Sequence, residues 1–346
     1  MEAWFIKEWQ RNGPWQILLR PVSWLFLFLV MLRRAAYRSG WLKVSNVGAP
    51  VIIVGNINVG GTGKTPLVLA LVEALSKHGK HCGIVTHGYQ PGADAPRAAV
   101  VHVVPTGPGV ASPSDEATLL ARRSGVPVYA AANRVEAAQT LLRNHGQVDV
   151  VISDDGLQHY ALQRDIEICV IDGARGLGNG GLLPAGPLRE PASRLDVVDA
   201  IIVNRVANIT DVKNYSATTP AFDMTLANEL FVNLKSGRSI ETADAVTRFQ
   251  GMRIHALAGT GNPQRFFSHL ERLGLRLAKT QPFPDHHNYQ ERDMPDADAA
   301  IILMTEKDAV KCGAFADERM WFMRVDALLP NDFIDLVLKK LAARKA

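Results

Sequence analysis

The feature that most constrains the fold is an uninterrupted strand, glycine-rich turn and helix start at residues 51–66, VIIVGNINVGGTGKTP. The run Val51–Val54 is typical of a buried β-strand, and Lys64, Thr65 and Pro66 are typical of the first turn of a helix. Successive backbone N–H groups in such a loop form a nest for anions, and the helix that follows points its positive end at the same phosphates. The segment therefore predicts a P-loop and a bound nucleotide.

The residues of this loop have expected roles. Lys64 would contact the β- and γ-phosphates, and the Thr65 hydroxyl would bind Mg²⁺. The usual GxxxxGK[ST] pattern has glycine where this chain has Asn58, but three later glycines keep the turn free to bend. The predicted nucleotide-binding residues are Asn58, Val59, Gly60, Gly61, Thr62, Gly63, Lys64 and Thr65. The alternative is a tight turn that binds no nucleotide.

A second polar element follows another predicted strand, in VVISDDG at residues 150–156. Ligands of open α/β sheets bind at the carboxyl ends of parallel strands, and a carboxylate there can hold Mg²⁺ directly or through water. Asp154 and Asp155 are therefore the predicted metal ligands. Taken alone, such an acidic pair is more often a helix N-cap.

After Pro50, short β-branched runs alternate with helical stretches, which predicts an α/β fold: a mostly parallel, P-loop NTPase-like sheet with helices on both faces. Weaker periodicity between residues 209 and 250 predicts a connection there. The expected segments are an N-terminal helical arm at 1–45, a P-loop domain at 46–208, a linking segment at 209–250 and a smaller C-terminal α/β domain at 251–346. Predicted strands are Val51–Val54, Cys82–Thr86, Val100–Val104, Val148–Ser153, Ile166–Ile171, Ala200–Val203, Ile254–Ala258 and Ile301–Met304. Predicted helices are Pro66–Lys77, Asp115–Arg123, Arg134–Asn144, Pro263–Leu273 and Asn331–Lys345.

The N-terminal arm has the composition of a membrane-surface segment. Nine apolar residues run from Trp24 to Leu32, and five of the six tryptophans lie within the first 41 residues, as amphipathic rings do at the headgroup level. Extended back to Pro21, the stretch covers about 18 Å, against roughly 30 Å for a bilayer core. We therefore expect a monotopic anchor that leaves the chain after Lys43 in the cytoplasm. The alternatives are a cleaved signal peptide and a helix docked on the protein's own core.

Charge and cysteine content exclude other classes of protein. The net charge is +4, but residues 1–50 carry +5, so the remaining 296 residues sum to −1. A near-neutral body argues against a nucleic-acid-binding protein and leaves the positive charge to the arm, where it suits an anionic membrane surface. The three cysteines, Cys82, Cys169 and Cys312, have no CxxC spacing and favour a reducing compartment.

Four further polar clusters stand out: HGYQ at 87–90, SDEATLLARR at 114–123, LPAGPLREP at 183–191 and FPDHHNY at 283–289. The apolar N-terminus, the glycine-rich loop, SDDGLQH at 153–159 and TEKDAVKC at 305–312 occur in order with them. Together they resemble the tetraacyldisaccharide 4′-kinases, the lipid A 4′-kinases of bacteria with an outer membrane. The resemblance covers nearly the whole chain. It implies transfer of the ATP γ-phosphoryl group to the 4′-hydroxyl of a tetraacylated glucosamine disaccharide 1-phosphate, at the cytoplasmic face of the inner membrane.

The resemblance also implies roles for residues outside the loop. Asp115, paired with His286, would accept the proton of the sugar hydroxyl, and Lys64 would complete the catalytic set. Asp115 and His286 are far apart in sequence, so their spacing predicts neither role. Glu116 would be a further metal ligand. The positions that match family positions around the lipid substrate or the nucleotide are Tyr89, Arg134, His159, Arg189 and Glu190. ATP and Mg²⁺ are the implied cofactors, a lipid and the membrane surface are the implied partners, and no obligate protein partner is evident.

Less specific interpretations of these residues stay open. Ser114, Asp115 and Glu116 also suit the N-terminus of a helix, where acidic side chains favour the dipole. His286 and His287 beside Asp285 also suit a loop cluster or an adventitious metal site. For each of the substrate positions the alternative is a solvated surface residue.

Two departures from the family pattern affect these expectations. Where the family has the element RGYG, this chain has His87 and Gln90, which puts a cationic contact there in doubt. Where the family has GDEP, this chain has SDEA, beginning with Ser114.

The main rival class is a membrane-associated P-loop ATPase switch of the partitioning type. Those proteins carry a second lysine just before the paired glycines, where this chain has Val59. A soluble P-loop kinase or ligase of a small metabolite is the second rival, and it leaves the tryptophan-rich arm unexplained.

Overall fold

The computed structural model describes residues 8–9, 13–88, 102–103, 114–205, 216–285, 287–295 and 298–344, with the side chains of 102, 103, 205 and 228 left out. The chain forms two compact units. The first unit comprises Met1–Val104, Arg123–Thr225 and Ala327–Ala346, and the second comprises Pro105–Arg122 and Leu226–Asp326. Each unit is built on its own hydrophobic core, so each is described separately.

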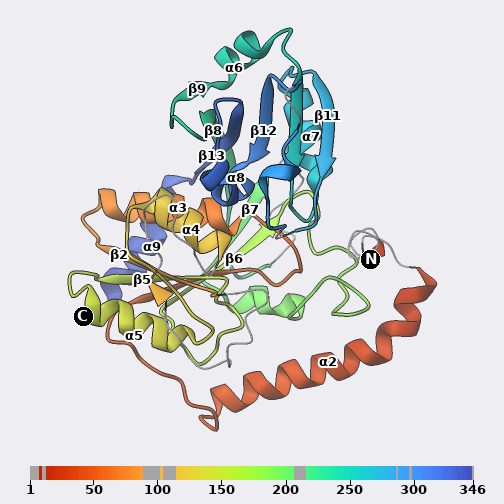
Figure 1. Ribbon diagram of the computed structural model, residues 1–346. Helices are drawn as coiled ribbons and strands as arrows, with labels where there is room; N and C mark the ends of the chain where they lie inside the picture. The colour runs from red at the N-terminus through yellow and green to blue at the C-terminus, as the bar shows by residue number, and fades with distance from the viewer. Residues whose placement is uncertain are drawn as a thin grey trace. The chain divides into compact units, whose positions relative to one another are not determined.

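The first unit is a mostly parallel β-sheet whose strand order is β8-β7-β6-β1-β5-β2-β4-β3 (Figure 1). Only the short strand β3 runs antiparallel to its neighbour. The strands are β1 (Val51–Gly55), β2 (Cys82–Thr86), β3 (His102–Val103), β4 (Val128–Ala130), β5 (Val150–Asp154), β6 (Ile166–Asp172), β7 (Ala200–Arg205) and β8 (Ala221–Asn233), which enters the second unit after Thr225. The helices are α2 (Pro14–Arg38), α3 (Lys64–Lys77), α5 (Arg134–Asn144), η1 (Ala192–Val197) and α9 (Asn331–Ala343).

The position of β1 in this sheet fixes where a ligand can bind. β1 pairs with β5 on one side and with β6 on the other, so strand order reverses beside it. In open parallel sheets this reversal opens a crevice at the carboxyl ends of the strands. The glycine-rich loop leaves β1 at that end, which is the position the sequence predicts.

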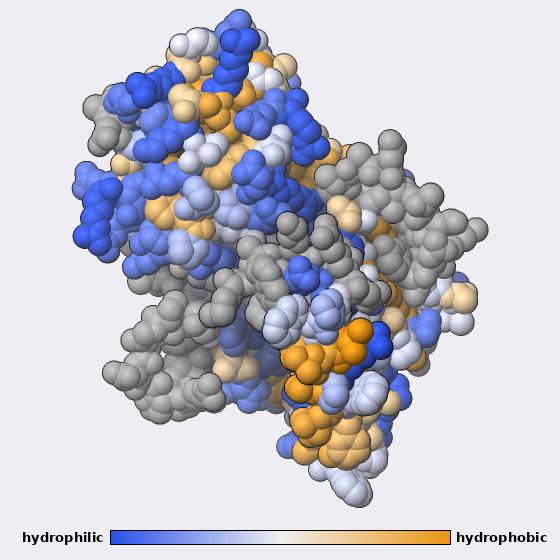
Figure 2. Space-filling model, turned by 90° about the vertical axis from the view of Figure 1, so that its right-hand side faces the viewer, coloured by the Kyte–Doolittle hydropathy of each residue, from blue (hydrophilic) through white to orange (hydrophobic). Residues whose placement is uncertain are grey.

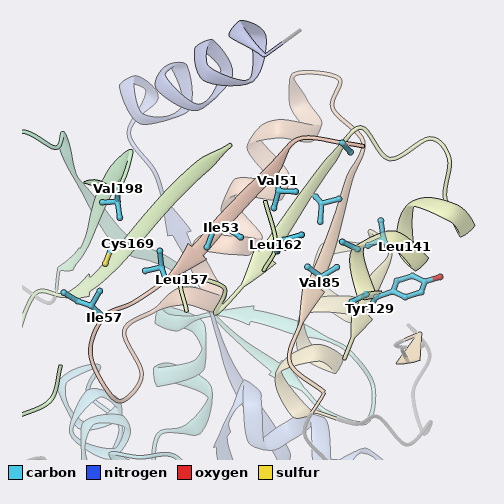
Figure 3. Packing of buried hydrophobic residues seen from close by; sticks show 14 of the residues in the cluster. Val51, Ile53, Ile57, Val85, Tyr129, Leu141, Leu157, Leu162, Cys169 and Val198 are labelled. Atoms are coloured by element: carbon cyan, nitrogen blue, oxygen red, sulfur yellow. The ribbon is translucent and has the colours of Figure 1, made fainter. Parts of the chain in front are cut away.

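The core of the first unit explains why these runs form central strands. Val51 and Ile53 of β1 belong to a cluster with Leu141 of α5 (Figure 3). The alternate residues Ile52 and Val54 point to the opposite face of the sheet and are also fully buried. Both faces are therefore covered, as the continuous apolar runs of the strands predict.

The long N-terminal helix α2 extends beyond the apolar stretch seen in the sequence. Its 25 residues correspond to about 37 Å. By length and composition the helix could cross a membrane, yet only 11% of its most apolar window is buried. Its exposed apolar side chains gather in the lower part of the face shown in Figure 2. This exposure does not fit the alternative of a helix docked on the protein's own core.

The second unit is a smaller α/β body. Its strand order is β11-β10-β12-β13-β8, with β9 paired antiparallel to β8. The strands are β9 (Ser239–Glu241), β10 (Ile254–Ala258), β11 (Leu277–Pro282), β12 (Ile301–Thr305) and β13 (Met320–Leu328), and the helices are α4 (Asp115–Ser124), α6 (Thr242–Phe249), α7 (Pro263–Arg272), η3 (Glu291–Asp293), α8 (Glu306–Cys312) and η4 (Gly313–Phe315). Its core joins Phe231, Phe249 and Trp321, whose rings pack edge to face.

The predicted strands and helices that fall on described residues are present to within about three residues at each end. The division into units differs from the expected segments in two places. Residues 209–250 hold all of β8, β9 and α6, and the part of this segment from Leu226 onward belongs to the second unit. The last helix, α9, belongs to the first unit, where Phe333 packs against Phe222. Most of Val100–Val104 lies outside the described residues.

Candidate active site

The glycine-rich loop occupies residues 56–63 between β1 and α3. Gly60 and Gly63 both have φ of 96°, a left-handed conformation that side chains with a Cβ rarely adopt. Gly63 is also crowded, because a Cβ there would collide with the Asn204 side chain. The two glycines are thus needed for the path of the loop, and α3 begins directly after it with Lys64.

Hydrogen bonds within the loop, and between the loop and the segments at Gly176 and Asn204, hold it in place. Asn56 donates from its amide to the carbonyl of Asn58 at 2.8 Å, and Asn204 at the end of β7 donates to the carbonyl of Thr62 at 3.1 Å. The Asn58 amide donates to the carbonyl of Gly176 at 2.8 Å. These bonds fix the loop backbone before any ligand binds, which lowers the entropic cost of binding.

Arg175 lies against the same loop. It donates to the carbonyl of Gly61 and is held by Asp172 at the end of β6, with 3.2 Å between Nε and Oδ2. A guanidinium that reaches the phosphate-binding loop is suited to contact a phosphate. The sequence interpretation missed Arg175 and Asn204, because only the fold brings the segments around 175 and 204 to the loop. It also gave no role to Asn56, which lies within the motif and contacts Lys64 and the backbone of Asn58.

Lys64, Asp155 and Arg189 form a group that we call the loop cluster. Lys64 Nζ lies 3.3 Å from Asp155 Oδ1 and donates to Asn56 Oδ1 at 3.2 Å, and Arg189 Nη1 lies 3.7 Å from Asp155 Oδ2. The side chains of Asp155 and Arg189 are 36% and 35% exposed. Burial raises the pKa of Asp155, but Lys64 and Arg189 outweigh that effect and hold the pKa below its usual value. The carboxylate is therefore ionised beside two cations.

Asp155 has an unusual backbone. It has φ of 50°, the only described residue other than glycine with a positive φ. Aspartate tolerates this left-handed conformation better than most residues, and such strain is concentrated at functional sites. The turn carries the Asp155 side chain to Lys64 rather than continuing β5.

Asp154 and Arg134 lie one layer deeper. Asp154 is buried and accepts a hydrogen bond from Thr86 Oγ1 at 3.3 Å. Arg134 is 2% exposed and donates to the carbonyls of Thr86, Ala131 and Asp154. Burial is the main cause that lowers the pKa of Arg134 to about 10. This environment favours a positioning role for Arg134, which ties the ends of β2 and β5 together, over the predicted contact with substrate.

The residues at the loop fit a magnesium ion of the kind that nucleotides bring. The described part of the chain contains no group of three or more His, Cys, Asp or Glu side chains that could cage a metal. Mg²⁺ is usually held by one or two carboxylates together with substrate phosphates and water. Thr65, half-buried in the first turn of α3, and the carboxylates of Asp154 and Asp155 supply that set of oxygen atoms.

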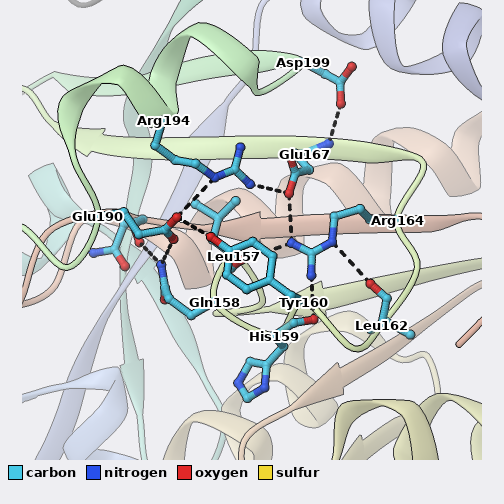
Figure 4. Close-up of polar contacts among 11 residues, drawn as sticks. Leu157, Gln158, His159, Tyr160, Leu162, Arg164, Glu167, Glu190, Arg194 and Asp199 are labelled. Carbon is cyan, nitrogen blue, oxygen red and sulfur yellow. Dashed lines mark hydrogen bonds and ion pairs between the residues drawn. The ribbon is translucent and has the colours of Figure 1, made fainter. Parts of the chain in front are cut away.

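A second charged group, which we call the buried cluster, comprises Glu190, Arg194 and Glu167 (Figure 4). Arg194 pairs with Glu167 and lies 3.3 Å from Glu190, and its side chain is 2% exposed. Glu190 also accepts hydrogen bonds from Gln158 and from the Tyr160 hydroxyl. Glu190 is 1% exposed, so its environment favours a structural role over the predicted contact with lipid.

His159 is half-buried and lies in sequence between Asp155 of the loop cluster and Glu167 of the buried cluster. Burial, followed by the nearby Arg134, lowers the pKa of His159 to about 4. The imidazole is therefore neutral at physiological pH. Its backbone carbonyl accepts a hydrogen bond from Arg164, so the segment is held while the ring remains available to accept or donate one hydrogen bond.

The second unit contains the acidic pair of α4. Ser114 caps the helix, since its hydroxyl accepts the Ala117 N–H at 3.4 Å. Lys311 Nζ lies 3.1 Å from Asp115 Oδ2, and Lys307 Nζ lies 3.4 Å from Glu116 Oε1. Both lysines come from α8, in the motif at 305–312 whose role the sequence left unassigned. They hold the two carboxylates in position.

Several predicted residues remain predictions. Tyr89, Gln90 and His286 lie outside the described residues. His287 is described and pairs with Asp293 at 3.0 Å while it stacks on Phe283. His87 is exposed at the carboxyl end of β2.

A parallel sheet with this loop between β1 and α3, and with carboxylates at the end of the adjacent strand, defines a P-loop nucleotide-binding protein. The model of one family, Tetraacyldisaccharide-1-P 4′-kinase, matches residues 15–342. The chain therefore belongs to the tetraacyldisaccharide-1-phosphate 4′-kinase family.

Curated relatives and a solved structure agree with this assignment. Tetraacyldisaccharide 4′-kinase of Methylobacillus flagellatus is 45% identical over 98% of this chain and 96% of its own length. The protein of the same name from Dechloromonas aromatica is 44% identical over 100% of this chain and 99% of its own. A crystal structure of LpxK from Aquifex aeolicus in complex with ATP superposes with a TM-score of 0.77 at 26% identity, and covers 94% of this chain and 99% of that one. The similarity spans both units and most of α2.

Proposed function

We propose that this chain transfers the γ-phosphoryl group of ATP to the 4′-hydroxyl of a tetraacylated disaccharide 1-phosphate, a step in lipid A biosynthesis. The observation that carries the proposal is the loop cluster at the end of β1 and β5, in a chain that belongs to a family named for this reaction. The solved relative binds ATP, which supports ATP as the donor. The partitioning-type ATPase is not favoured, since family membership and Val59 both argue against it.

The residues around the loop support the donor half of the reaction. The backbone N–H groups of residues 60–65 and the start of α3 would bind the β- and γ-phosphates, with Lys64 beside them. Thr65, Asp154 and Asp155 would hold Mg²⁺, which neutralises charge on the phosphates when bound. Because Asp155 already lies beside Lys64 and Arg189, an incoming triphosphate would find a site of fixed charges that needs little rearrangement.

The acceptor half needs a base. A sugar hydroxyl is a weak nucleophile at neutral pH, so a carboxylate must accept its proton as the oxygen bonds to the γ-phosphorus. The bond from that phosphorus to the bridging oxygen breaks, and ADP leaves with the electron pair. Asp115 is our candidate base, with His286 as its partner, and Lys311 would fix the direction of the Asp115 carboxylate.

We place the protein at the cytoplasmic face of the inner membrane, with α2 lying along the membrane surface. Both halves of α2 contact the first unit: Ser23 Oγ donates to the carbonyl of Leu182 at 2.9 Å, and the Tyr37 ring packs on Tyr160 at 5.8 Å. Because α2 is held to the body near its middle and near its C-terminal end, we infer that it lies along the membrane surface and not across the bilayer. Its outward face is apolar and exposed, with Trp24 68% and Leu18 66% exposed, which suits the headgroup and acyl boundary.

The direct test uses the purified full chain with γ-labelled ATP, Mg²⁺ and tetraacyl disaccharide 1-phosphate in detergent micelles. Labelled lipid that requires all three components is the expected result. Absence of labelled lipid under conditions in which ATP binds would remove the proposal.

The Asp115→Ala variant tests the assignment of the base. We expect turnover to fall by about 10²–10⁴-fold, the usual contribution of general base catalysis, with little change in the Kd for ATP. Asp317→Ala is the matched control, because that carboxylate pairs only locally with Arg319 in the same unit. A wild-type rate for Asp115→Ala would clear Asp115 of this role.

A further inference from the structure

A pocket of about 300 Å³ lies beneath the C-terminal end of α2, within the first unit. It is lined by Arg34 and Arg38 from the helix, by Arg164 and Arg194 from the body, and by one carboxylate, that of Glu167. A volume of this size is at the lower end of the range of small-molecule sites, about 300–1,000 Å³. The pocket is therefore large enough for a headgroup, and its lining is strongly cationic.

Two carboxylates, Glu167 in the lining and Glu190, which lies 3.3 Å from Arg194, cannot neutralise the four arginines. Glu167 already pairs with Arg164 at 2.8 Å and with Arg194 (Figure 4). Arg34 and Arg38 form no ion pair with any residue in the described ranges of the chain. Burial, and then the like charges of Arg194 and Arg38, lower the pKa of Arg34. An anion bound here would relieve that repulsion.

The pocket is separate from the candidate active site. No residue of the glycine-rich loop lines it, and neither do Lys64, Asp155 and Arg189. Glu167 lies in the first half of β6, where it pairs with Ile53 of β1. It is therefore not at the carboxyl ends of the strands, the edge at which the glycine-rich loop leaves β1. Ligands that react at the loop bind at the carboxyl ends of the strands, so the pocket beneath α2 lies away from the place where the phosphoryl group would be transferred.

The surroundings of the pocket indicate which anion it receives. Met31, one turn before Arg34, and Trp24, about three turns before it, lie on the same side of α2 as Arg34, and their apolar side chains are exposed. A ligand with a phosphate in the pocket could therefore lay its acyl chains against this apolar face. Arginine guanidinium groups bind phosphate oxygens in a planar, two-pronged geometry.

We propose that this pocket binds the phosphate headgroup of an anionic membrane phospholipid, as an accessory lipid site distinct from the site of phosphoryl transfer. The bound lipid would fix the depth and rotation of α2 at the membrane surface. The proposal rests on the placement of α2 at the membrane given above, and binding can be measured whether or not the chain is active as a kinase.

The test is native mass spectrometry of the full chain in a nonionic detergent with phosphatidylglycerol. The pocket variant is Arg34→Gln with Arg38→Gln, and the control is Arg20→Gln with Lys43→Gln, which removes the same charge from the arm outside the pocket. We expect the wild type and the control to retain one phosphatidylglycerol, and the pocket variant to bind it about tenfold more weakly or worse, as the loss of one charge-assisted hydrogen bond implies. Arg38→Gln alone, at an exposed position, replaces the double variant if that does not fold.

Five results would overturn the proposal. If the pocket variant retained phosphatidylglycerol as well as the wild type, or if the control lost it as fully as the pocket variant, only general charge attraction would be acting. Equal retention of phosphatidylcholine, or displacement of the lipid by inorganic phosphate at matched concentration, would show that the ligand is not an anionic lipid. An increase in the KM for the disaccharide substrate in the pocket variant, with phosphatidylglycerol retention unchanged, would assign the pocket to the substrate instead.

Discussion

The loop cluster and the buried cluster are built from the same kinds of side chain and differ in what surrounds them. In the loop cluster, Asp155 and Arg189 are each about one third exposed and meet at 3.7 Å. In the buried cluster, Arg194 is 2% exposed and each of its carboxylate partners has a second hydrogen-bond donor. An exposed, loosely paired cation can exchange its partner for a phosphate, whereas a buried, saturated one cannot without leaving a charge unpaired. The same residue types thus serve binding in one place and stability in the other.

The largest expected effect tests the buried cluster. Arg194→Leu leaves Glu190 and Glu167 buried without their shared partner, and we expect it to reduce the free energy of unfolding by about 3–5 kcal/mol. Chemical denaturation of the detergent-solubilised chain measures this change. Arg189→Leu in the loop cluster is the matched control and should alter stability by less than about 1 kcal/mol. Similar losses in the two variants would contradict the distinction between the clusters.

The next effect tests the loop cluster. Lys64→Ala removes a fixed cation beside the transferring phosphoryl group, and we expect kcat to fall by about 10²–10³-fold with the unfolding free energy nearly unchanged. The assay with γ-labelled ATP measures the rate, and denaturation measures stability. Lys77→Ala, at the other end of α3 in an exposed pair with Glu73, is the control and should be active. A rate within threefold of wild type for Lys64→Ala would show that the loop cluster does not act on the phosphoryl group.

The sequence predicted the parts of the site that are continuous in the chain. The loop, Lys64, Thr65 and the acids after β5 could be found because a strand, a turn and a helix start have local patterns. Arg175 and Asn204 were missed because their approach to the loop depends on the order of β6 and β7 in the sheet. Nothing in the local sequence encodes that order.

The type of a residue also did not show whether its side chain is buried. Arg134 and Glu190 match motif positions and were expected at the substrate, yet each is at most 2% exposed and bonded to the protein's own groups. Four strands that run through the second unit, β8, β9, β11 and β13, were missed, and two of them show a related reason. β11 is largely exposed and polar, and β13 is only partly buried, so neither has a clear apolar pattern. The fold class could be predicted from the central strands, whose neighbours cover both faces.

The smallest expected effect concerns His159, which lies in sequence between Asp155 of the loop cluster and Glu167 of the buried cluster. Because its pKa is about 4 in the folded chain and about 6.5 when unfolded, the unfolded chain binds an extra proton between these values. Stability should therefore fall as pH decreases from about 6.5 toward 4, by less than about 1 kcal/mol per pH unit, since the ring is partly exposed. His159→Gln should flatten this slope, while His78→Gln on the surface should not. Denaturation midpoints between pH 4.5 and 7.5 measure the dependence of stability on pH. Burial raises the pKa of Glu167, but Arg194 and Arg164 outweigh that effect and hold the pKa low, so in the folded chain this carboxylate takes up its proton below the measured range. If the slope of stability against pH were the same in His159→Gln as in the wild type, burial would not lower the pKa of this imidazole. The buried environment of the neighbouring clusters would then not include the His159 ring.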